Sequence, residues 1–223
     1  MSLTRYGFAH AISGFFELPT ENARTLLPRM LEPVELHHGT SVLSITVFDF
    51  VESVVGPYRE LVLSVVVAPL VRSGERLPKS ALFPYLVATT TASARSHAIE
   101  RRHLPHWMED ARIDIDRAEG SISAQVSIAG APVAELTVGE HSWQRVSHLY
   151  QSFMRDGDEA FMADIIMEGS QSEHEEEVGR LVLHEHPFHG ALSLGEVSDV
   201  PVREVWMRDG VQTFENLIRL PAA

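Results

Sequence analysis

The feature that most constrains the fold is a run of valines and leucines between Tyr58 and Ala68, which follows the dipeptide Gly56-Pro57. Proline fixes φ and glycine tolerates unusual backbone angles, so this dipeptide predicts a turn or bend. Apolar residues then fall on odd and even positions alike, which is typical of a strand buried on both faces. We therefore expect the fold to be built around this strand.

Glu60 lies at the entrance of this strand, beside residues that disfavour water. The alternation of a strand places Glu60 on the same side as Tyr58, Val62 and Ser64. A carboxylate in this position is either a strand-end residue that reaches solvent or a residue of a functional site with a shifted pKa. The strand alone leaves both interpretations open.

Composition limits the classes of function. The chain has 223 residues, which predicts a single domain over residues 1–223. A formal net charge of −13 argues against a nucleic-acid partner and against binding to an anionic membrane. The longest apolar run, Leu61 to Val71, is too short to span a bilayer, and the N-terminus lacks the apolar segment of a signal peptide. We therefore expect a cytoplasmic protein.

The sequence also narrows the chemistry. It contains no cysteine, which excludes disulfides, thiolate nucleophiles and cysteine-bound metals. It contains no glycine-rich phosphate-binding loop, and we expect no cofactor. Lys79 is its single lysine. Because arginine does not deprotonate and cannot replace lysine in a Schiff base, carbonyl–imine chemistry would depend on Lys79 alone.

Two short helices are predicted. Thr20 is a plausible N-cap for a helix over Glu21–Leu27, which has an acidic residue at its positive end. The threonines at 89–91 are suited to cap a second helix over Ala92–Arg102, which consists largely of small residues and arginines. Small residues along a helix indicate close packing against a sheet.

The remaining segments predict many strands. Asp209-Gly210 is a strong hairpin signal, residues 169–177 are predicted to form an acidic turn, and the segment 141–154 has no clear assignment. These patterns predict an α+β fold that is mostly antiparallel β and barrel-like. Strands are predicted over residues 1–19, 42–50, 58–68, 82–88, 113–116, 122–128, 133–138, 161–167, 178–183, 202–207 and 211–220.

The order of these signals resembles the acetoacetate decarboxylase superfamily over nearly the whole chain. The segment from Leu27-Pro28 to Pro33 looks like the Leu-Pro…Leu-x-Pro opening of the family, and Tyr58-Arg59-Glu60 is similar to its Tyr-x-Glu strand. Glu100 and Pro105 fall where the family has Gly-Arg-Glu…Gly-x-Pro-Lys. Two further segments look like its final strands, 181–187 and 202–205.

This resemblance implies a cone-shaped β-barrel with an adjoining sheet, a few short helices and a buried cavity. It also implies a homo-oligomer and a small keto-acid-like or apolar ligand. In the decarboxylases of the family, the lysine after the proline forms a Schiff base with a β-keto acid. An apolar pocket and a neighbouring cation lower the pKa of that lysine, and the glutamate of the Tyr-x-Glu strand assists.

The chain departs from the family pattern at the lysine. Alignment on Pro105 places His106 at the lysine position and Trp107 after it, while His103 replaces the second glycine. We expect His103 and Trp107 to contact the ligand, and we expect Trp107 to be a wall or core residue and not a reactive one. Lys79 precedes the predicted helix instead of following it. The sequence therefore argues against decarboxylation through a Schiff base.

One hypothesis is a lysine-free enzyme of the lyase, hydratase or hydrolase type. His106 has an imidazole that titrates near neutrality, which suits a general acid or base, although a hydrogen-bonded histidine that fills the space of the lysine is equally consistent. Glu60 and Glu100 stand at the glutamate positions of the family and are further acid–base candidates. Tyr58 or Arg59 would orient a carbonyl or carboxylate group. We expect His106 and Glu60 to line one shared cavity.

Two other hypotheses remain. A cavity without its nucleophile would bind a small ligand without converting it, as in a sensor or carrier. A metal site is also conceivable at His184 and His186, which are two apart on a predicted strand and are followed by His189. Chance clusters are expected among 12 histidines, and a solvated strand face explains this pair as well. We therefore expect no native metal.

Overall fold

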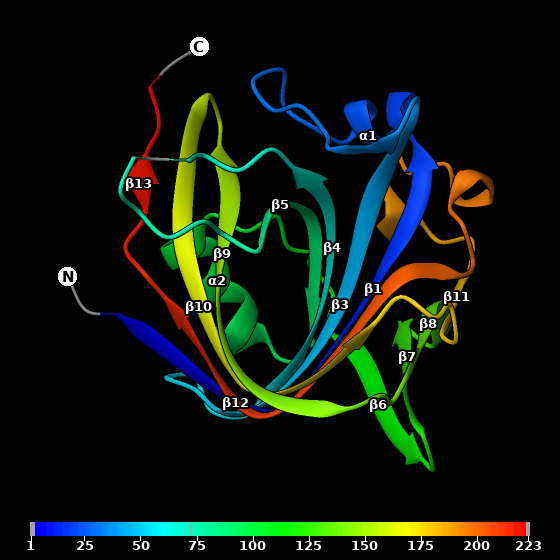
Figure 1. The fold of residues 1–223 in the computed structure, drawn as a ribbon. Coiled ribbons are helices and arrows are strands. Elements are labelled where there is room, and N and C mark those ends of the chain that lie inside the picture. Colours follow the sequence, from blue (N-terminus) through cyan, green and yellow to red (C-terminus); the bar gives the residue numbers. More distant parts are fainter. Residues whose placement is uncertain (1–2, 72, 222–223) are drawn as a thin grey trace.

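Seven long strands pair side by side until the last meets the first, which closes a barrel (Figure 1). The computed structural model describes residues 3–71 and 73–221. Neighbouring barrel strands are antiparallel except β5 and β9, which pair in parallel. The order around the barrel is β1 (Thr4–Pro19), β12 (Pro201–Phe214), β10 (Glu159–His174), β9 (Trp143–Asp156), β5 (Ser80–Thr89), β4 (Tyr58–Val67) and β3 (Thr40–Glu52), which pairs with β1.

Short elements extend the barrel. Two small strands pair with β3 and β10, two helices follow β1 and β5, and two 3₁₀ turns precede β12. Within the described residues, no helix is long and apolar enough to cross a membrane. In chain order these elements are α1 (Thr20–Thr25), β2 (Glu35–His37), α2 (Ala92–Arg102), η1 (Pro187–His189), η2 (Leu194–Glu196) and β13 (Ile218–Arg219).

A separate antiparallel sheet packs against the outside of the barrel (Figure 1). Leu61, Leu63 and Val65 of β4 point outward and share one core with Ile122 and Leu136 of this second sheet. Burial of each such side chain contributes about 1.5–3 kcal/mol. One face of β4 therefore meets the second sheet and the other lines the barrel, which explains its apolar run. The order of the sheet is β11 (Arg180–Leu183), β8 (Ala131–Gly139), β7 (Ser121–Ile128) and β6 (Ala111–Ala118).

Helix α2 has the bounds that its sequence predicts. The Thr91 side chain accepts a hydrogen bond from Ala94 N at 3.3 Å, which confirms the expected cap. Ala94 and Ala98 pack into the core that fills the barrel interior, as small residues on a helix indicated. The helix ends at Arg102, and its C-cap His103 has a left-handed φ of 54° that turns the chain away.

The predicted hairpin at Asp209-Gly210 is wrong, because β12 runs through both residues as one strand. Asp209 has a positive φ of 49°, and the register of β10 against β12 shifts between Glu168 and Ser170. The dipeptide therefore forms a bulge that bends the strand without reversing it. A Cβ on Gly210 would lie 2.3 Å from Phe8 Cζ and 2.4 Å from the Glu168 carbonyl oxygen, so this bulge requires glycine.

Other local predictions also fail. The predicted acidic turn over 169–177 is largely strand, because β10 continues to His174 and pairs with strands on both sides. Helix α1 begins at Thr20 and has Pro19 as its N-cap, so Thr20 is not the cap. The Thr20 hydroxyl instead lies 2.9 Å from the Ser41 hydroxyl on β3. Pairing between strands outweighs local composition at both places.

We expect Gly210→Ala to lower the free energy of unfolding by about 1–3 kcal/mol, because the added methyl group overpacks the contact with Phe8 and Glu168. Gly195→Ala is the matched control, since a Cβ there meets nothing within 4 Å. Its effect should stay within about 0.5 kcal/mol. Urea denaturation followed by circular dichroism measures both variants, and equal stabilities would contradict the close approach at Gly210.

Candidate functional site

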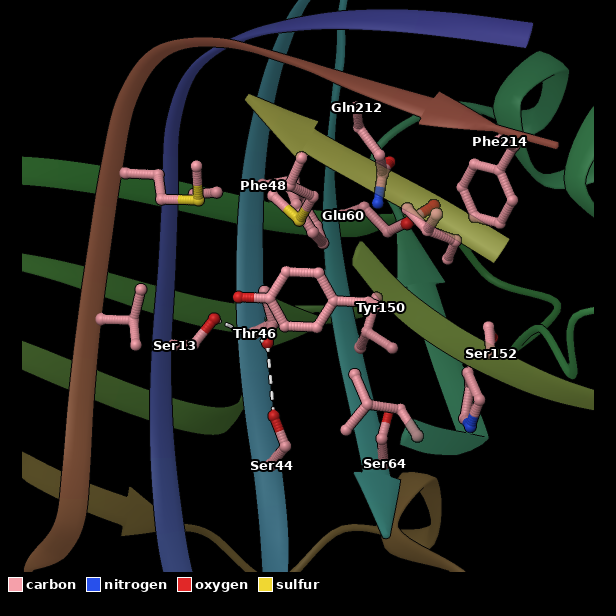
Figure 2. Close-up of a pocket in the computed structure, with 18 of the residues that line it drawn as sticks. Ser13, Ser44, Thr46, Phe48, Glu60, Ser64, Tyr150, Ser152, Gln212 and Phe214 are labelled. Atoms are coloured by element: carbon pink, nitrogen blue, oxygen red, sulfur yellow. Dashed lines mark hydrogen bonds between the residues drawn. The ribbon is translucent and has the colours of Figure 1, made fainter. Parts of the chain in front are cut away.

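The barrel encloses a cavity of about 90 Å³, several times the roughly 10–15 Å³ that one water molecule needs. Its walls are inward-facing side chains of the barrel strands (Figure 2). Leu104, from the loop after α2, also lines it. The lining consists of Ala11, Ser13, Phe15, Ser44, Thr46, Phe48, Glu60, Val62, Ser64, Leu82, Pro84, Leu104, Tyr150, Ser152, Ile165, Met167, Val205, Met207, Gln212 and Phe214.

Strand register arranges inward-facing residues of β4, β3, β1 and β12 in successive levels. Paired residues stand opposite each other, and each level lies two residues along every strand from the next. We name the levels after their β4 residue. They are the Glu60 level (Glu60, Phe48, Ala11, Met207), the Val62 level (Val62, Thr46, Ser13, Val205) and the Ser64 level (Ser64, Ser44, Phe15, Arg203).

Glu60 brings a carboxyl group into this cavity. The residue is only 7 % exposed, and no hydrogen bond or ion pair joins its carboxyl group to another described residue. Burial raises the pKa of Glu60 from 4.5 to about 8, because desolvation penalises the charged form. The carboxyl group is therefore mostly protonated at pH 7 and gains or loses a proton close to neutrality.

The other lining groups are neutral. Ser13 Oγ lies 2.9 Å from Thr46 Oγ1, and Ser44 Oγ lies 3.5 Å from the same atom (Figure 2). Gln212 adds an amide, and Tyr150 adds a phenol that stays protonated because burial raises its pKa. The described lining contains no lysine, arginine or histidine. Such a cavity favours a ligand that is neutral or apolar where it meets the walls.

Strand alternation decides where Tyr58 and Arg59 point. Tyr58 shares the inward face with Glu60, but it packs on Phe50 with ring centroids 4.9 Å apart and is not in the cavity lining. Arg59 points outward, where Nε donates to Asp49 Oδ1 at 3.0 Å and Nη1 donates to Ile113 O at 2.7 Å. Arg59 ties the barrel to the second sheet, so the expected ligand contact is wrong for this cavity.

His106 does not line the cavity, so the expectation that it shares one cavity with Glu60 is wrong. The turn at His103 brings Leu104 to the cavity wall instead. The chain then runs beside β5, where His106 forms an isolated parallel bridge with Val87. The position that aligns with the family lysine therefore lies beside β5, outside the cavity lining.

The environment of His106 suppresses its charge. Burial and, to a lesser extent, Arg95 lower the pKa of His106 to about 4, so the ring is neutral at pH 7. Both ring nitrogens are buried without a hydrogen-bond partner among the described residues, and so is Trp107 Nε1. Trp107 packs edge to face on Phe188 with ring centroids 5.9 Å apart, in the core outside the barrel. Trp107 is therefore a core residue and not a wall of this cavity.

Glu100 and His103 also lie away from the cavity. Glu100 is exposed on α2, whose buried face is formed by Ala94, Ala98 and Arg102. His103 Nδ1 lies 3.1 Å from Asp156 Oδ2, and its ring stacks on Phe161 with centroids 4.7 Å apart. Neither residue belongs to the cavity lining, so the structure does not bring them together with Glu60 in this cavity.

Lys79 lies outside the cavity, immediately before β5. Its Nζ forms an ion pair with Glu173 and lies 3.4 Å from His148 Nε2. Lys79 lines a second pocket that adjoins the cavity at Phe15. The single lysine of the chain is thus close to the barrel interior but does not face the group at Glu60.

His184 and His186 follow β11, which ends at Leu183, so the prediction that they share a strand face is wrong. His184 Nε2 lies 2.9 Å from Glu135 Oε1, whereas His186 Nδ1 accepts a hydrogen bond from Phe188 N at 3.0 Å. Among the residues that the structure describes, no group of three potential side-chain ligands is arranged to hold a metal ion.

Most of the cavity lining could not be recognised in the sequence. Tyr150 and Ser152 lie on β9, within the segment 141–154 that has no clear sequence pattern. Gln212 lies on the part of β12 that the hairpin signal separates from the first half. Glu60 and Ser64 were recognisable as polar residues on one face of an apolar strand, and Ser44 and Thr46 occupy alternate positions of the neighbouring strand in the same way.

No protein-family model matches the sequence, and no curated protein matches it significantly. Among solved structures, an acetoacetate decarboxylase matches with a TM-score of 0.68 and 12% identity, over 99% of this chain and 90% of that one. The acetoacetate decarboxylase of Legionella pneumophila matches with a TM-score of 0.68 and 14% identity, over 99% and 88%. The enduracididine biosynthesis enzyme MppR, complexed with pyruvate, matches with a TM-score of 0.64 and 12% identity, over 99% and 90%. The chain therefore has the acetoacetate decarboxylase-like fold that its motifs predicted.

Proposed function

We propose that the cavity binds a small carbonyl compound and that Glu60 moves a proton on this compound without an imine intermediate. The observation that carries the proposal is the carboxyl group of Glu60, which lines the cavity without a hydrogen-bond partner in the described chain and has a pKa of about 8. A group whose pKa lies near the working pH suits general acid–base catalysis, because both of its protonation states are populated.

The proposed step is proton abstraction next to a carbonyl group. The ionised Glu60 carboxylate takes a proton from that carbon, and the electron pair of the broken C–H bond forms the enolate. The enolate oxygen accepts a hydrogen bond from a neutral donor of the lining, such as the Gln212 amide or the Tyr150 phenol. Return of the proton from Glu60 to carbon completes an exchange or an isomerisation.

The charge of the lining supports an uncharged group as the reacting end of the ligand. The described walls contain no cation, and a carboxylate close to Glu60 would raise its pKa further by repulsion between like charges. MppR, which shares the fold, is complexed with pyruvate. For this chain we propose an uncharged ketone, or the uncharged end of a longer molecule, beside Glu60.

The position of Lys79 supports chemistry without an imine. An imine at the reacting carbonyl would require a free amine in the cavity lining, and the described lining has none. The Lys79 amine is held by Glu173 in the neighbouring pocket. His106 adds no acid to the proposal, since its ring is neutral at pH 7 and lies outside the lining.

One observation favours a second candidate, a protein that binds its ligand without converting it. Glu60 is the sole carboxylate in the described lining, and the Tyr150 phenol is kept protonated by burial. The cavity therefore offers one group that exchanges a proton near pH 7. Reactions that need a separate acid and base, such as dehydration, lack a second group here.

Incubation with butanone in D₂O distinguishes the two candidates. We expect the protein to accelerate deuterium uptake at the carbons next to the carbonyl group. Glu60→Gln should reduce that acceleration by about 100- to 10,000-fold, the usual contribution of a general base. Glu100→Gln is the matched control, because it removes an exposed carboxylate from α2. Proton NMR measures the exchange rate.

The outcomes of this experiment are distinct. Saturation-transfer signals from bound butanone without deuterium uptake would support the binding protein and reject proton transfer. Equal acceleration by wild type and Glu60→Gln would reject the role of Glu60. Loss of acceleration in Glu100→Gln would assign the chemistry to α2 instead of the cavity.

We expect borohydride reduction in the presence of acetoacetate to leave no covalent adduct, since the Lys79 amine is ion-paired outside the cavity. Intact-protein mass spectrometry detects an adduct, and peptide mapping locates it. Free lysine treated in the same way shows that the reducing conditions trap imines. An adduct on Lys79 would overturn the lysine-free mechanism.

The raised pKa of Glu60 also links its protonation to stability. Above about pH 4.5 the unfolded chain loses this proton, whereas the folded chain keeps it until about pH 8. We therefore compare the free energy of unfolding of the wild type with that of Glu60→Gln. We expect the wild-type value minus the variant value to fall by about 1 kcal/mol for each unit that the pH rises across this interval. Urea denaturation at a series of pH values measures the difference, and a difference independent of pH would contradict an unpartnered buried carboxyl group.

A further inference from the structure

A second pocket continues the inward face of the barrel beyond the cavity. We call it the outer pocket; its volume is about 440 Å³, and Phe15 lines both it and the cavity. Val42 and Val66 line the outer pocket two residues beyond Ser44 and Ser64, which line the cavity. Because alternate residues of a strand share a face, the two pockets are consecutive parts of one barrel interior.

The outer pocket differs from the cavity in its cations. Lys79 and Arg203 are among its lining residues. The Arg203 guanidinium carbon lies 3.8 Å from the centroid of the Phe15 ring, so Arg203 covers the ring that the two pockets share. Glu175 also lines this pocket, but its carboxylate is exposed to solvent. The cavity lining has no cationic side chain, whereas the outer pocket next to it has two.

Arg203 lacks a hydrogen-bond acceptor among the described residues. Its Nε is buried without a partner, and Glu173 Oε1 lies 3.9 Å from that atom, which is longer than a hydrogen bond. Lys79 Nζ and Gln171 Nε2 both donate to Oε2 of Glu173, so Oε1 approaches Arg203 only at that longer distance. A guanidinium presents its N–H donors in a planar fork that matches a carboxylate. An acceptor from a ligand would complete this arrangement.

Arg203 and Glu60 lie at opposite ends of the cavity. Arg203 belongs to the Ser64 level, which is four residues along β4 from Glu60. Four residues of a strand span about 13 Å, or about 10 Å along the barrel axis once strand tilt is included. A ligand that reaches both residues is therefore elongated, and a molecule of the size of pyruvate does not span them.

We propose that Arg203, assisted by Lys79, binds the carboxylate of an elongated apolar carboxylic acid whose chain passes Phe15 into the cavity. The proposal rests on the ligand-binding cavity proposed above, but not on proton transfer by Glu60. Arg203 pairs with the carboxylate through parallel N–H donors. The apolar walls bury the chain, and its far end meets the protonated carboxyl group of Glu60.

Calorimetric titration of the full chain with octanoate tests this assignment. We expect octanoate to bind more tightly than butyrate, whose chain is too short to fill the cavity, and more tightly than octanol, which lacks the carboxylate. Arg203→Gln should weaken octanoate binding by about 10-fold or more, the usual effect of losing a charged hydrogen bond. Arg145→Gln is the matched control, because it removes an exposed arginine from β9 and should leave binding within about twofold.

Each outcome decides between the proposals. Equal affinity of octanoate and octanol, or equal affinity in Arg203→Gln and Arg145→Gln, would overturn the carboxylate site. If Arg203→Gln does not fold, octanoate binding by Arg203→Lys and the difference in affinity between octanoate and octanol test the same carboxylate site. Octanoate binding that depends on Arg203, without exchange of butanone, would reject proton transfer by Glu60 and keep the carboxylate site. Exchange of butanone that depends on Glu60, together with octanoate binding that does not depend on Arg203, would keep proton transfer by Glu60 and reject the carboxylate site.

Discussion

The pairing between β1 and β3 is the constraint on which the rest of the structure depends, because it closes the barrel from Gly7–Glu52 to Pro19–Thr40. In an open sheet, the inward residues of these strands would face a covering layer or solvent. In the closed barrel they face one another, and alternate positions of every strand must share a small interior. Glu60 is buried for this reason, although a carboxyl group gains nothing from an apolar surrounding.

Two buried glutamates show how differently the fold treats such groups. Glu204 on β12 is fully buried, and its carboxylate oxygens accept hydrogen bonds from Gly139 N and Gly179 N, both at 2.6 Å. These bonds join β12 to the second sheet and to the loop before β11, so Glu204 holds the fold together. Glu60 has no such donors among the described residues and faces free space instead. An unsatisfied acid beside a cavity is difficult to explain by stability alone, which is why we assign it a function.

The sequence predicted what depends on local patterns. The strand β4 with apolar residues on both faces, the bounds of α2 and the three strands β6, β7 and β8 follow from alternation, capping and local composition, and all of them are found in the structure. The sequence could not predict which strands pair with each other. This pairing places Lys79 near Glu173 and brings Tyr150 into the cavity. The prediction for His106 was wrong for a related reason. A motif alignment gives only a position along the chain, whereas the turn at His103 brings Leu104 and not His106 to the cavity.

The separation of charge along the barrel axis has a chemical consequence. A cation close to a carbonyl group stabilises negative charge as electrons leave carbon, and an amine there forms an imine that does so more strongly. In this chain both Lys79 and Arg203 line the outer pocket, while the cavity is lined by a neutral acid, hydroxyl groups and apolar side chains. In our proposals, the charged side chains hold the ligand and Glu60 transfers the proton. The acetoacetate decarboxylase-like barrel accommodates this arrangement because its interior levels are filled by side chains that vary independently of the strand pairing around them.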